Sequence, residues 1–264
     1  MIVITNIYIG PGGTAGLGYD KGLREISSLG LNAMEVEFTH GVNMSNATAK
    51  IVGALAKKLK ISLSCHAPYF INLASDEKAK VNASKVRILQ SCERMHNLGG
   101  GPVVFHPGFY QKKTKEETYS RIRDEVKNLM KVVKQKKWNV KLALETTGKH
   151  SAFGSLDELL SLVKDIKCSL TIDFAHLKAR TEGKMGYGEM LDRVKHLKHI
   201  HSHFSGIEWT AKGERRHLLT PAKDINELIR EVLKRKLDIT IINESPDVIG
   251  DAVKMKKVLE KCKK

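Results

Sequence analysis

Leu142-Ala-Leu-Glu145 is an apolar run that ends in a carboxylate, and five other segments of this chain are built in the same way. They are Leu63-Ser-Cys-His66, Val103-Val-Phe-His106, Leu170-Thr-Ile-Asp173, Ile200-His201 and Ile239-Thr-Ile-Ile-Asn-Glu244. Short runs rich in Val, Ile and Leu indicate buried parallel strands. A His, Asp or Glu at the C-terminal tip of such a strand is typical of an active-site rim. Six such tips, all with zinc-type side chains, predict one convergent metal site.

The order of elements around these segments predicts the fold. Strands are expected at about 2–8, 33–38, 61–66, 102–106, 139–145, 169–173, 198–203 and 238–243. Helices are expected after them at about 20–29, 47–60, 78–98, 114–137, 156–165, 186–194, 222–235 and 249–262. Eight strand-helix units in a row predict an α/β fold, a single (β/α)8 TIM barrel spanning residues 1–264.

Local signals support some of these boundaries. Ser155 precedes Leu-Asp-Glu and Asp224 precedes Ile-Asn-Glu, so both are predicted to cap helices. The segment from about 204 to 221 is predicted to be the longest loop, and loops of this length are often functional.

The composition fits one domain in a reducing compartment. The chain has 264 residues and 41% hydrophobic content, which suits a barrel of about 250 residues. It lacks a long apolar segment and a basic leader, so a cytoplasmic protein is expected. The four cysteines show no CxxC spacing and are predicted to be free thiols. Cys65 would point to the opposite face of its strand from His66, so it is not counted as a ligand.

The net charge of +16 comes from 45 Lys and Arg against 29 Asp and Glu. This excess favours a polyanionic partner, most simply nucleic acid. A solvated lysine-rich surface explains it equally well, because much of the charge falls on predicted outer helices. Both interpretations stay open at this stage.

Each candidate ligand also has an ordinary structural explanation. A histidine at a strand end, such as His66, is more often structural, and a lysine or arginine could pair with Glu145. Asp173 and His176 would share a face if a helical turn began at Asp173. His201 and His203 are spaced to lie on one strand face. Unrelated structural reasons at successive strands are much less plausible than one shared site.

The donor chemistry of this set suits zinc. Mixed imidazole and carboxylate ligands favour Zn²⁺ or a similar first-row ion, whereas magnesium favours oxygen ligands alone. The set is too large for one tetrahedral ion, which predicts two or three zinc ions bridged by a carboxylate. Clusters of this kind clamp a phosphodiester and generate hydroxide at neutral pH.

The motifs resemble those of the endonuclease IV family of apurinic/apyrimidinic endonucleases. The matching stretches run from His66 to Glu244, and the more specific ones are His66-Ala-Pro-Tyr-Phe-Ile-Asn-Leu-Ala, Phe-His106-Pro-Gly, Leu-Glu145-Thr-Thr-Gly and Asp173-Phe-Ala-His176. The resemblance implies a zinc-dependent TIM barrel that cuts double-stranded DNA 5′ to an abasic site during base excision repair. It implies a divergent member, and a monomer is expected.

The resemblance also implies roles for individual residues. His66, His106 and Glu145 would hold one zinc, and catalytic Glu145 would bridge to a second zinc. Asp173, His201 and Glu244 would complete the second site, and His176 would belong to a third. Hydroxide activated by the cluster would attack the phosphorus.

Tyr69 and Phe70 fall where the family places side chains that probe the DNA minor groove. Wedges of this kind unstack and kink a duplex, which helps an enzyme that needs an extrahelical sugar. The alternative is that both rings pack the mouth of the barrel.

The chain departs from the family pattern at three places. One is the loop Phe38-Thr-His-Gly-Val-Asn-Met-Ser, which lacks a clear match to the family's DNA-contacting loop after strand 2. His203-Phe204 replaces an Asn-Asp pair just past the seventh strand, taking His201 as the strand histidine. Aligned on His217, Arg215 stands where a carboxylate of the third zinc is expected, and Glu214 is one residue away. The third metal is therefore either absent or held by His176, His217 and either Glu214 or His203.

Two other classes of protein remain as alternatives. A single-metal sugar isomerase or epimerase of the xylose-isomerase-like superfamily resembles the set Glu145, Asp173, His201 and Glu244. It would not need His66, His106 and His176 as additional ligands. A basic nucleic-acid-binding protein with a degenerate catalytic site would fit the departures. Metal content distinguishes the three classes.

Overall fold

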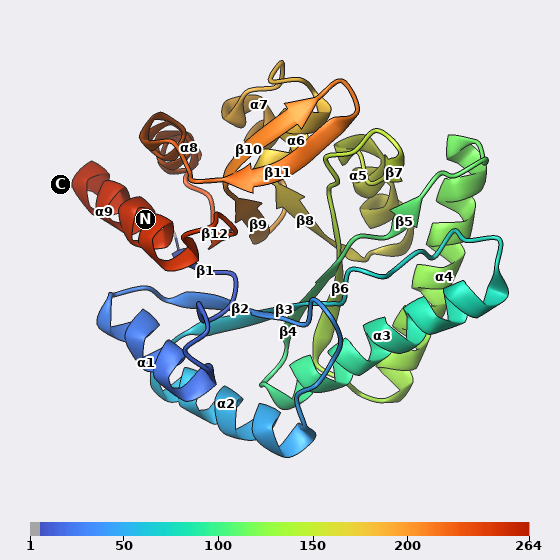
Figure 1. The fold of residues 1–264 in the computed structure, drawn as a ribbon, viewed down its shortest axis with the longest axis horizontal. Helices are drawn as coiled ribbons and strands as arrows, with labels where there is room; N and C mark the ends of the chain where they lie inside the picture. The colour runs from blue at the N-terminus through green and yellow to red at the C-terminus, as the bar shows by residue number, and fades with distance from the viewer. Residues whose placement is uncertain (1–5, 264) are drawn as a thin grey trace. The chain divides into compact units, whose positions relative to one another are not determined.

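The computed structural model describes residues 6–263, in which strands and helices follow one another along the chain (Figure 1). The strands are β1 Ile7–Pro11, β2 Ala33–Glu37, β3 Ser62–His66, β4 Gly101–Phe105, β5 Gly108–Phe109, β6 Val140–Glu145, β7 Ala152–Phe153, β8 Ser169–Asp173, β9 Ile200–Phe204, β10 Gly206–Thr210, β11 Gly213–Leu218 and β12 Ile239–Asn243. The helices are α1 Tyr19–Ser28, α2 Asn46–Lys58, α3 Lys78–Asn97, α4 Lys115–Gln135, α5 Leu156–Ile166, α6 Phe174–Arg180, α7 Tyr187–Val194, α8 Ala222–Arg235 and α9 Val248–Lys263.

Eight of these strands belong to one sheet, in the order β1-β12-β9-β8-β6-β4-β3-β2. Along the chain each of the eight is followed by at least one helix, and the pairings within the sheet are parallel. The predicted succession of eight strand-helix units, and with it the (β/α)8 fold class, is confirmed.

The chain packs as two compact units. The first unit comprises Met1–Glu35, Lys57–Ser62 and Ile172–Lys264, and the second comprises Val36–Ala56 and Leu63–Thr171. The boundaries between them fall inside β2, α2, β3 and β8. The expectation of one domain over residues 1–264 stays a prediction.

In the first unit, β12 lies between β1 and β9, with Ile241 opposite Ile9 and Ser202. Helix α8 packs against α7 and α9. It buries Ile225, Leu228, Ile229 and Val232, which recur with the spacing of one helix face. Parallel pairing brings the C-terminal ends of β9 and β12 to the same edge, and this determines where the side chains that follow them lie.

In the second unit, β4 lies between β3 and β6, with Val103 opposite Cys65 and Leu142. Helix α4 starts at a capping box, because Thr114 and Glu117 each accept a hydrogen bond from the other's backbone N–H. Helix α5 starts at a similar box between Ser155 and Glu158, so the predicted cap at Ser155 is confirmed.

Several predicted boundaries were wrong. The first strand was expected at about 2–8, of which residues 2–5 lie outside the described part; the structure has the strand at Ile7–Pro11. Helix α8 begins at Ala222 after Pro221, so Asp224 lies in its first turn and does not cap it. Proline already supplies the required backbone angle at that position. A helix directly after β8, α6, was not predicted because its seven residues are too few for a periodic signal.

The expected long loop at 204–221 is largely a β-hairpin. Strands β10 and β11 pair antiparallel and pack against α6 (Figure 1). The second strand of the hairpin, Gly-Glu-Arg-Arg-His-Leu, alternates charged and apolar residues only weakly. Its strand character comes from pairing with β10, which local sequence does not reveal.

None of the helices in the described part of the chain combines the length and apolar character that a membrane crossing needs. The four cysteines are free, as predicted; Cys65, Cys92 and Cys168 are buried and Cys262 is exposed. Burial raises the pKa of the Cys92 thiol to about 12, which indicates a structural and unreactive thiol.

Candidate functional site

Among the described residues, three clusters of histidines and carboxylates each lie within one unit, two in the first unit and one in the second. In each, ligand atoms of three residues all lie within 4.8 Å of one another; the triads are His66, His106 and Glu145; Asp173, His176 and His217; and Glu35, His201 and His203. We call them the His66 group, the His176 group and the Glu35 group.

The His66 group forms where β3, β4 and β6 end. His66 and Glu145 are the last residues of β3 and β6, and His106 directly follows β4. Both imidazoles converge on the same carboxylate oxygen: Nε2 of His66 lies 3.0 Å and Nε2 of His106 2.9 Å from Oε2 of Glu145. His66 and Glu145 are buried, and His106 is partly exposed. The structure therefore brings together the three residues predicted to share a metal.

The hydrogen bond of His66 Nδ1 determines what its Nε2 presents to Glu145. Its Nδ1 lies 2.7 Å from the carbonyl oxygen of Ala67, which can only accept, so Nδ1 carries a proton. A neutral ring then presents a lone pair at Nε2, facing the Glu145 carboxylate. Two acceptors 3.0 Å apart repel each other. The arrangement requires positive charge, either as a second proton on His66 or as a metal ion bound by both groups.

The His176 group is built around the start of α6. Asp173 ends β8 and caps α6, accepting a 2.7 Å hydrogen bond from the backbone N–H of His176. The same carboxylate lies 3.3 Å from Nδ1 of His176. A helical turn thus begins at Asp173, and the two side chains share a face.

The hairpin supplies His217, the third member of the His176 group. Nδ1 of His217 lies 3.1 Å from the carbonyl oxygen of Glu244 and 3.2 Å from Oγ of Ser205, while its Nε2 lies 3.4 Å from Nε2 of His176. Because the Glu244 carbonyl accepts a hydrogen bond from the Nδ1–H of His217, the Nε2 of His217 presents a lone pair to the other ring. Facing lone pairs of two imidazoles are the donor arrangement of a zinc site.

Glu214 provides a carboxylate for this group. Its Oε2 lies 3.3 Å from Nε2 of His176, whereas Arg215 points to an ion pair with Glu208 on the exposed side of the hairpin. Of the two alternatives open for the third site, the structure therefore favours Glu214 over His203 as the neighbour of His176.

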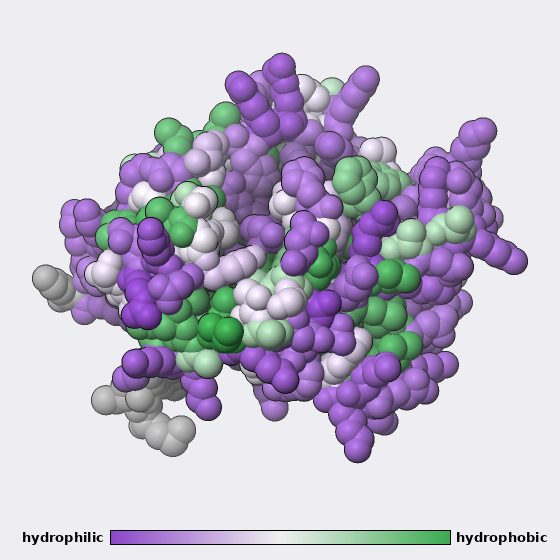
Figure 2. Space-filling model, turned by 60° about the horizontal axis from the view of Figure 1, so that its bottom comes forward, coloured by the Kyte–Doolittle hydropathy of each residue, from purple (hydrophilic) through white to green (hydrophobic). Residues whose placement is uncertain are grey.

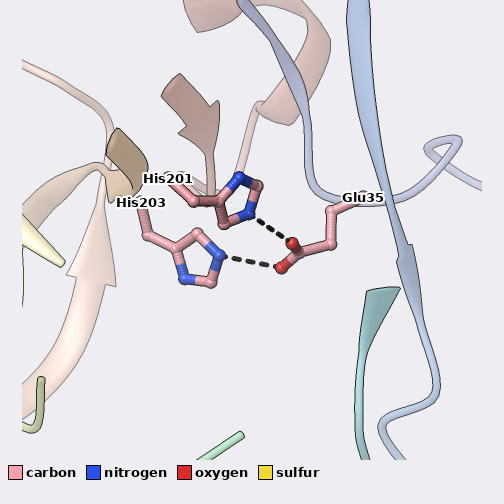
Figure 3. Close-up of side chains that lie close together, drawn as sticks. All are labelled: Glu35, His201 and His203. Carbon is pink, nitrogen blue, oxygen red and sulfur yellow. Dashed lines mark hydrogen bonds and ion pairs between the residues drawn. The ribbon is translucent and has the colours of Figure 1, made fainter. Parts of the chain in front are cut away.

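The Glu35 group was only partly predicted (Figure 3). Oε2 of Glu35 accepts a 2.9 Å hydrogen bond from Nε2 of His201, and Oε1 lies 2.8 Å from Nε2 of His203. Nδ1 of His203 lies 3.1 Å from Oε1 of Glu244. His203, two residues beyond the histidine assigned by resemblance, is therefore the β9 residue beside Glu244. If His203 instead of His201 is taken as the strand histidine, the expected Asn-Asp pair aligns with Ser205-Gly206 and no longer with His203-Phe204.

Glu35 was not among the predicted ligands. The available signal was a glutamate inside the otherwise apolar run Ala33-Met-Glu-Val, but its position one residue before Val36 did not mark a strand tip. Glu35 has no exposed surface, and its backbone is held by a 2.8 Å hydrogen bond from Gly13. Burial alone would raise the pKa of Glu35, but His203 and His201 outweigh burial and lower it, so the residue is a carboxylate.

The donor sets fit divalent metal ions. In the first unit, the carboxylates of Glu35, Asp173, Glu214 and Glu244 lie among four histidines, and all eight are buried or partly buried. Carboxylates at such density are costly without compensating positive charge. Mixed nitrogen and oxygen donors favour a first-row ion over magnesium. The predicted metal-type groups are present, whereas the identity and number of ions stay predictions.

Tyr69 and Phe70 lie on the surface of the second unit. Their exposed fractions are 56% and 68%, so neither ring is packed in a core. Tyr69 lies beside His66 with ring centroids 5.8 Å apart, and the carbonyl oxygen of Phe70 accepts a 2.9 Å hydrogen bond from Arg87. The second unit therefore presents two exposed aromatic rings, one of them beside a metal-type histidine.

The chain belongs to the family described as "Xylose isomerase-like TIM barrel", whose model matches residues 23–262. An "Uncharacterized protein MJ0133" of Methanocaldococcus jannaschii is 38% identical over 256 residues, covering 92% of this chain and 90% of that protein. A "Probable endonuclease 4" of Mycoplasma mobile is 28% identical over 194 residues, covering 69% and 67%. The resemblance to endonuclease IV proteins is therefore confirmed, at modest identity.

Solved structures of two functional classes share the fold. Endonuclease IV from Thermus thermophilus has a TM-score of 0.70 and 20% identity, covering 98% of this chain and 100% of that one. A D-tagatose 3-epimerase-like protein has a TM-score of 0.72 and 19% identity, covering 97% and 96%. At these identities the likeness demonstrates the fold alone.

Proposed function

We propose that this chain is a metal-dependent phosphodiesterase of DNA that cuts 5′ to abasic sites in base excision repair. The observation that carries the proposal is the His66 group, in which two imidazoles converge on one oxygen of Glu145. A site with only the carboxylates and histidine of a single-metal isomerase would not need these two additional histidines. Relatives named endonuclease 4 support the choice of DNA as substrate.

The residues of this chain would hold and orient zinc ions without large rearrangement. The Ala67 carbonyl keeps the proton of His66 on Nδ1, which leaves Nε2 for a metal. The Glu244 carbonyl does the same for His217. When bound, the ions would supply positive charge beside a phosphate and make water more acidic. Glu145 is the proposed catalytic carboxylate.

The surface supports a polyanionic substrate. The net charge is +16, and hydrophilic side chains cover most of the face in Figure 2, with smaller hydrophobic patches between them. Exposed Tyr69 and Phe70 would supply the wedge that opens a duplex at a lesion. An abasic nucleotide lacks its base, so its extrusion costs less than that of an intact nucleotide.

Metal analysis combined with cleavage of a duplex containing one abasic site tests this proposal. We expect at least two zinc equivalents per chain and a single incision 5′ to the lesion, both lost after treatment with a chelator. His66→Gln should lose activity. His96→Gln is the matched control in the same unit, because His96 accepts a hydrogen bond from the backbone N–H of Asn139 and belongs to none of the three groups. Uncut abasic duplex with fully metal-loaded protein would contradict the proposal.

The salt dependence of DNA binding provides a second test. Neutralisation of several phosphates predicts that the logarithm of the binding constant falls linearly with the logarithm of salt concentration. A flat plot would mean that the positive charge is surface solvation, and the nucleic-acid proposal would lose that support.

A single-metal sugar isomerase or epimerase is the alternative function. The fold shared with solved epimerases favours it, as does the contact of His203 with Glu244, which completes a mixed donor set near Asp173. This alternative would be supported if the protein bound only one metal ion per chain even after zinc loading, converted a ketose and did not incise the duplex. Salt-dependent DNA binding without a stoichiometric metal ion and without turnover would indicate a nucleic-acid-binding protein with a degenerate site.

A further inference from the structure

The Glu35 group differs from a simple ligand cluster because its two rings approach separate oxygens of one carboxylate. His201 faces Oε2 and His203 faces Oε1, at 2.9 and 2.8 Å. All three side chains are buried. The rings lie 5.8 Å apart at an interplanar angle of 75°, so neither stacks on the other. Each ring therefore has its own hydrogen-bonding partner on Glu35 (Figure 3).

The position of His203 between two carboxylates is the second observation. Its Nε2 faces Glu35 and its Nδ1 faces Glu244, at 2.8 and 3.1 Å. A neutral imidazole can donate through one nitrogen only, and the other nitrogen presents a lone pair. A proton on Nε2 directs that lone pair at Glu244, and the space between two acceptors is then suited to a cation.

We propose that Glu35 is a positioning residue that holds the proton of His203 on Nε2 and directs Nδ1 toward a metal ion shared with Glu244. This inference rests on the metal site of the proposed function. Histidine ligands of metals commonly donate their second N–H to a carboxylate, which fixes both the tautomer and the orientation of the ring.

His201 then has a different role from that implied by resemblance. Its Nε2 donates to Oε2 of Glu35, while His203 faces the other oxygen. A buried carboxylate is far less costly when both oxygens accept hydrogen bonds. In the proposed arrangement His201 supports Glu35, Glu35 orients His203, and His203 binds the metal.

The backbone around Glu35 suits this role. Its carbonyl oxygen accepts from Gly13, and Gly12 forms a parallel bridge with Glu35. His201 and His203 lie on β9, which is paired with β12 along its length. Because the backbone of a paired strand is already fixed, its side chains lose little further conformational freedom when they form these contacts. A precisely oriented metal ligand needs such a rigid support.

Substitution of Glu35 by glutamine tests the proposal. Glutamine has the same shape, but its NH₂ group donates, so it cannot accept from both rings. If the NH₂ group faces His203, that ring must carry its proton on Nδ1, where a lone pair is needed for metal; if it faces His201, the His201 contact that supports residue 35 is lost instead. We expect the affinity for one zinc equivalent, measured by competition with a chelator in the absence of DNA, to fall about 10- to 100-fold. Cobalt(II) alone, as a spectroscopic probe, should show altered absorption for that equivalent and unchanged absorption for the rest.

Comparison of three alternating histidines sharpens the test. His203→Gln should lose that zinc equivalent, and His201→Gln should weaken it only as far as Glu35→Gln does. His199→Gln, just before β9, is the matched control, because His199 is hydrogen-bonded to the hydroxyl of Thr240 and belongs to none of the three groups. Loss of the equivalent in His201→Gln as complete as in His203→Gln would make His201 a ligand and overturn the proposal.

A measurement on the unsubstituted protein keeps the proposal falsifiable if Glu35→Gln does not fold. Nitrogen-15 spectra of the metal-free protein should show the proton of His203 on Nε2 near neutral pH. A proton on Nδ1 alone would overturn the proposal. Retained zinc affinity in Glu35→Gln, with normal incision of abasic duplex by the unsubstituted protein, would refute the role of Glu35 and leave the proposed function intact. Weakened zinc binding in Glu35→Gln, with no incision of abasic duplex by the unsubstituted protein, would support the role of Glu35 and contradict the proposed function.

Discussion

The His66 group and the Glu35 group use the same residue types in different geometries. In the His66 group two imidazoles converge on one oxygen of Glu145, and in the Glu35 group each imidazole has its own oxygen. Convergence on one atom concentrates donors in a small volume, which suits a cation. Distribution over two atoms satisfies a carboxylate, which suits an orienting role. The comparison teaches that the role of a histidine depends on what its second nitrogen faces.

The second nitrogen is constrained differently in the two groups. A backbone carbonyl, that of Ala67, fixes the proton of His66. A carboxylate, that of Glu35, faces His203. Substitution of a side chain leaves the backbone carbonyl of Ala67 in place, whereas substitution of Glu35 removes the carboxylate that faces His203. The two groups are therefore expected to differ most in their response to mutation.

The largest expected effect is that of Glu145→Gln. The amide cannot act as a shared anionic ligand, so incision of abasic duplex should fall to the uncatalysed background while the fold is retained. Glu125→Gln is the control, since Glu125 in the same unit pairs with Lys85 and lies outside the three groups. If folded, metal-loaded Glu145→Gln incised the duplex at close to the rate of the unsubstituted protein, Glu145 would have no part in the mechanism. The His66 group would then not be the catalytic cation site that distinguishes it from the Glu35 group.

Removal of metal should have the next largest effect. An ion at about 1,000 times its dissociation constant stabilises the folded state by about 4 kcal/mol, so chelation should lower the unfolding temperature clearly. Calorimetry with and without zinc measures this. A single cooperative transition in both states would support one domain over residues 1–264, and two separate transitions would refute it.

The exposed aromatic pair beside His66 should have a smaller effect that depends on the substrate. Opening a base step costs about a few kcal/mol, so Tyr69→Ala with Phe70→Ala should weaken incision of abasic duplex. Metal content and hydrolysis of a small phosphodiester should be unchanged. Phe109→Ala serves as control because Phe109 is also an exposed aromatic residue of the second unit. Equal losses on both substrates would mean that the rings support the loop of His66.

The smallest expected effect concerns the stability of the metal-free protein. Glu35 has a lowered pKa because His203 and His201 outweigh burial, so its contribution should be complete above the ordinary carboxyl range. It should be lost as the pH falls through the lowered pKa. Near neutral pH, Glu35→Gln should cost about 1–3 kcal/mol, the range for a buried polar group that loses its partner.

Urea unfolding of the two metal-free proteins at neutral and acidic pH measures this difference. The gap between them should narrow at acidic pH. A gap that widened with acid would mean that Glu35 is not held as a carboxylate by its two histidines.

Much of the fold could be predicted because its signals are local. Apolar runs such as Val103-Val-Phe and Leu142-Ala-Leu mark strands, and the Ser155 capping box marks a helix start without reference to the rest of the chain. The β10-β11 hairpin and the short helix α6 were missed. Pairing between strands stabilises the hairpin, and the cap at Asp173 together with packing against the hairpin stabilises α6.

The candidate groups divide in the same way. His66, His106 and Glu145 could be predicted to meet because each ends a neighbouring parallel strand. The choice between Glu214 and Arg215 could not, because adjacent residues of a hairpin strand point to opposite faces and only the fold shows which face meets α6.

By itself, the sequence determined the succession of eight strand-helix units, the metal-type residues at the strand tips and the positive charge. These depend on residue type and spacing along the chain, which are independent of distant partners. Only the tertiary structure decided that Glu35 meets His201 and His203. His201 is 166 residues away from Glu35 along the chain. It also decided that His203 lies beside Glu244. A two-residue shift along a strand keeps the same face, so the choice between these histidines depends on the register of β9 against its neighbours, which the local pattern does not specify.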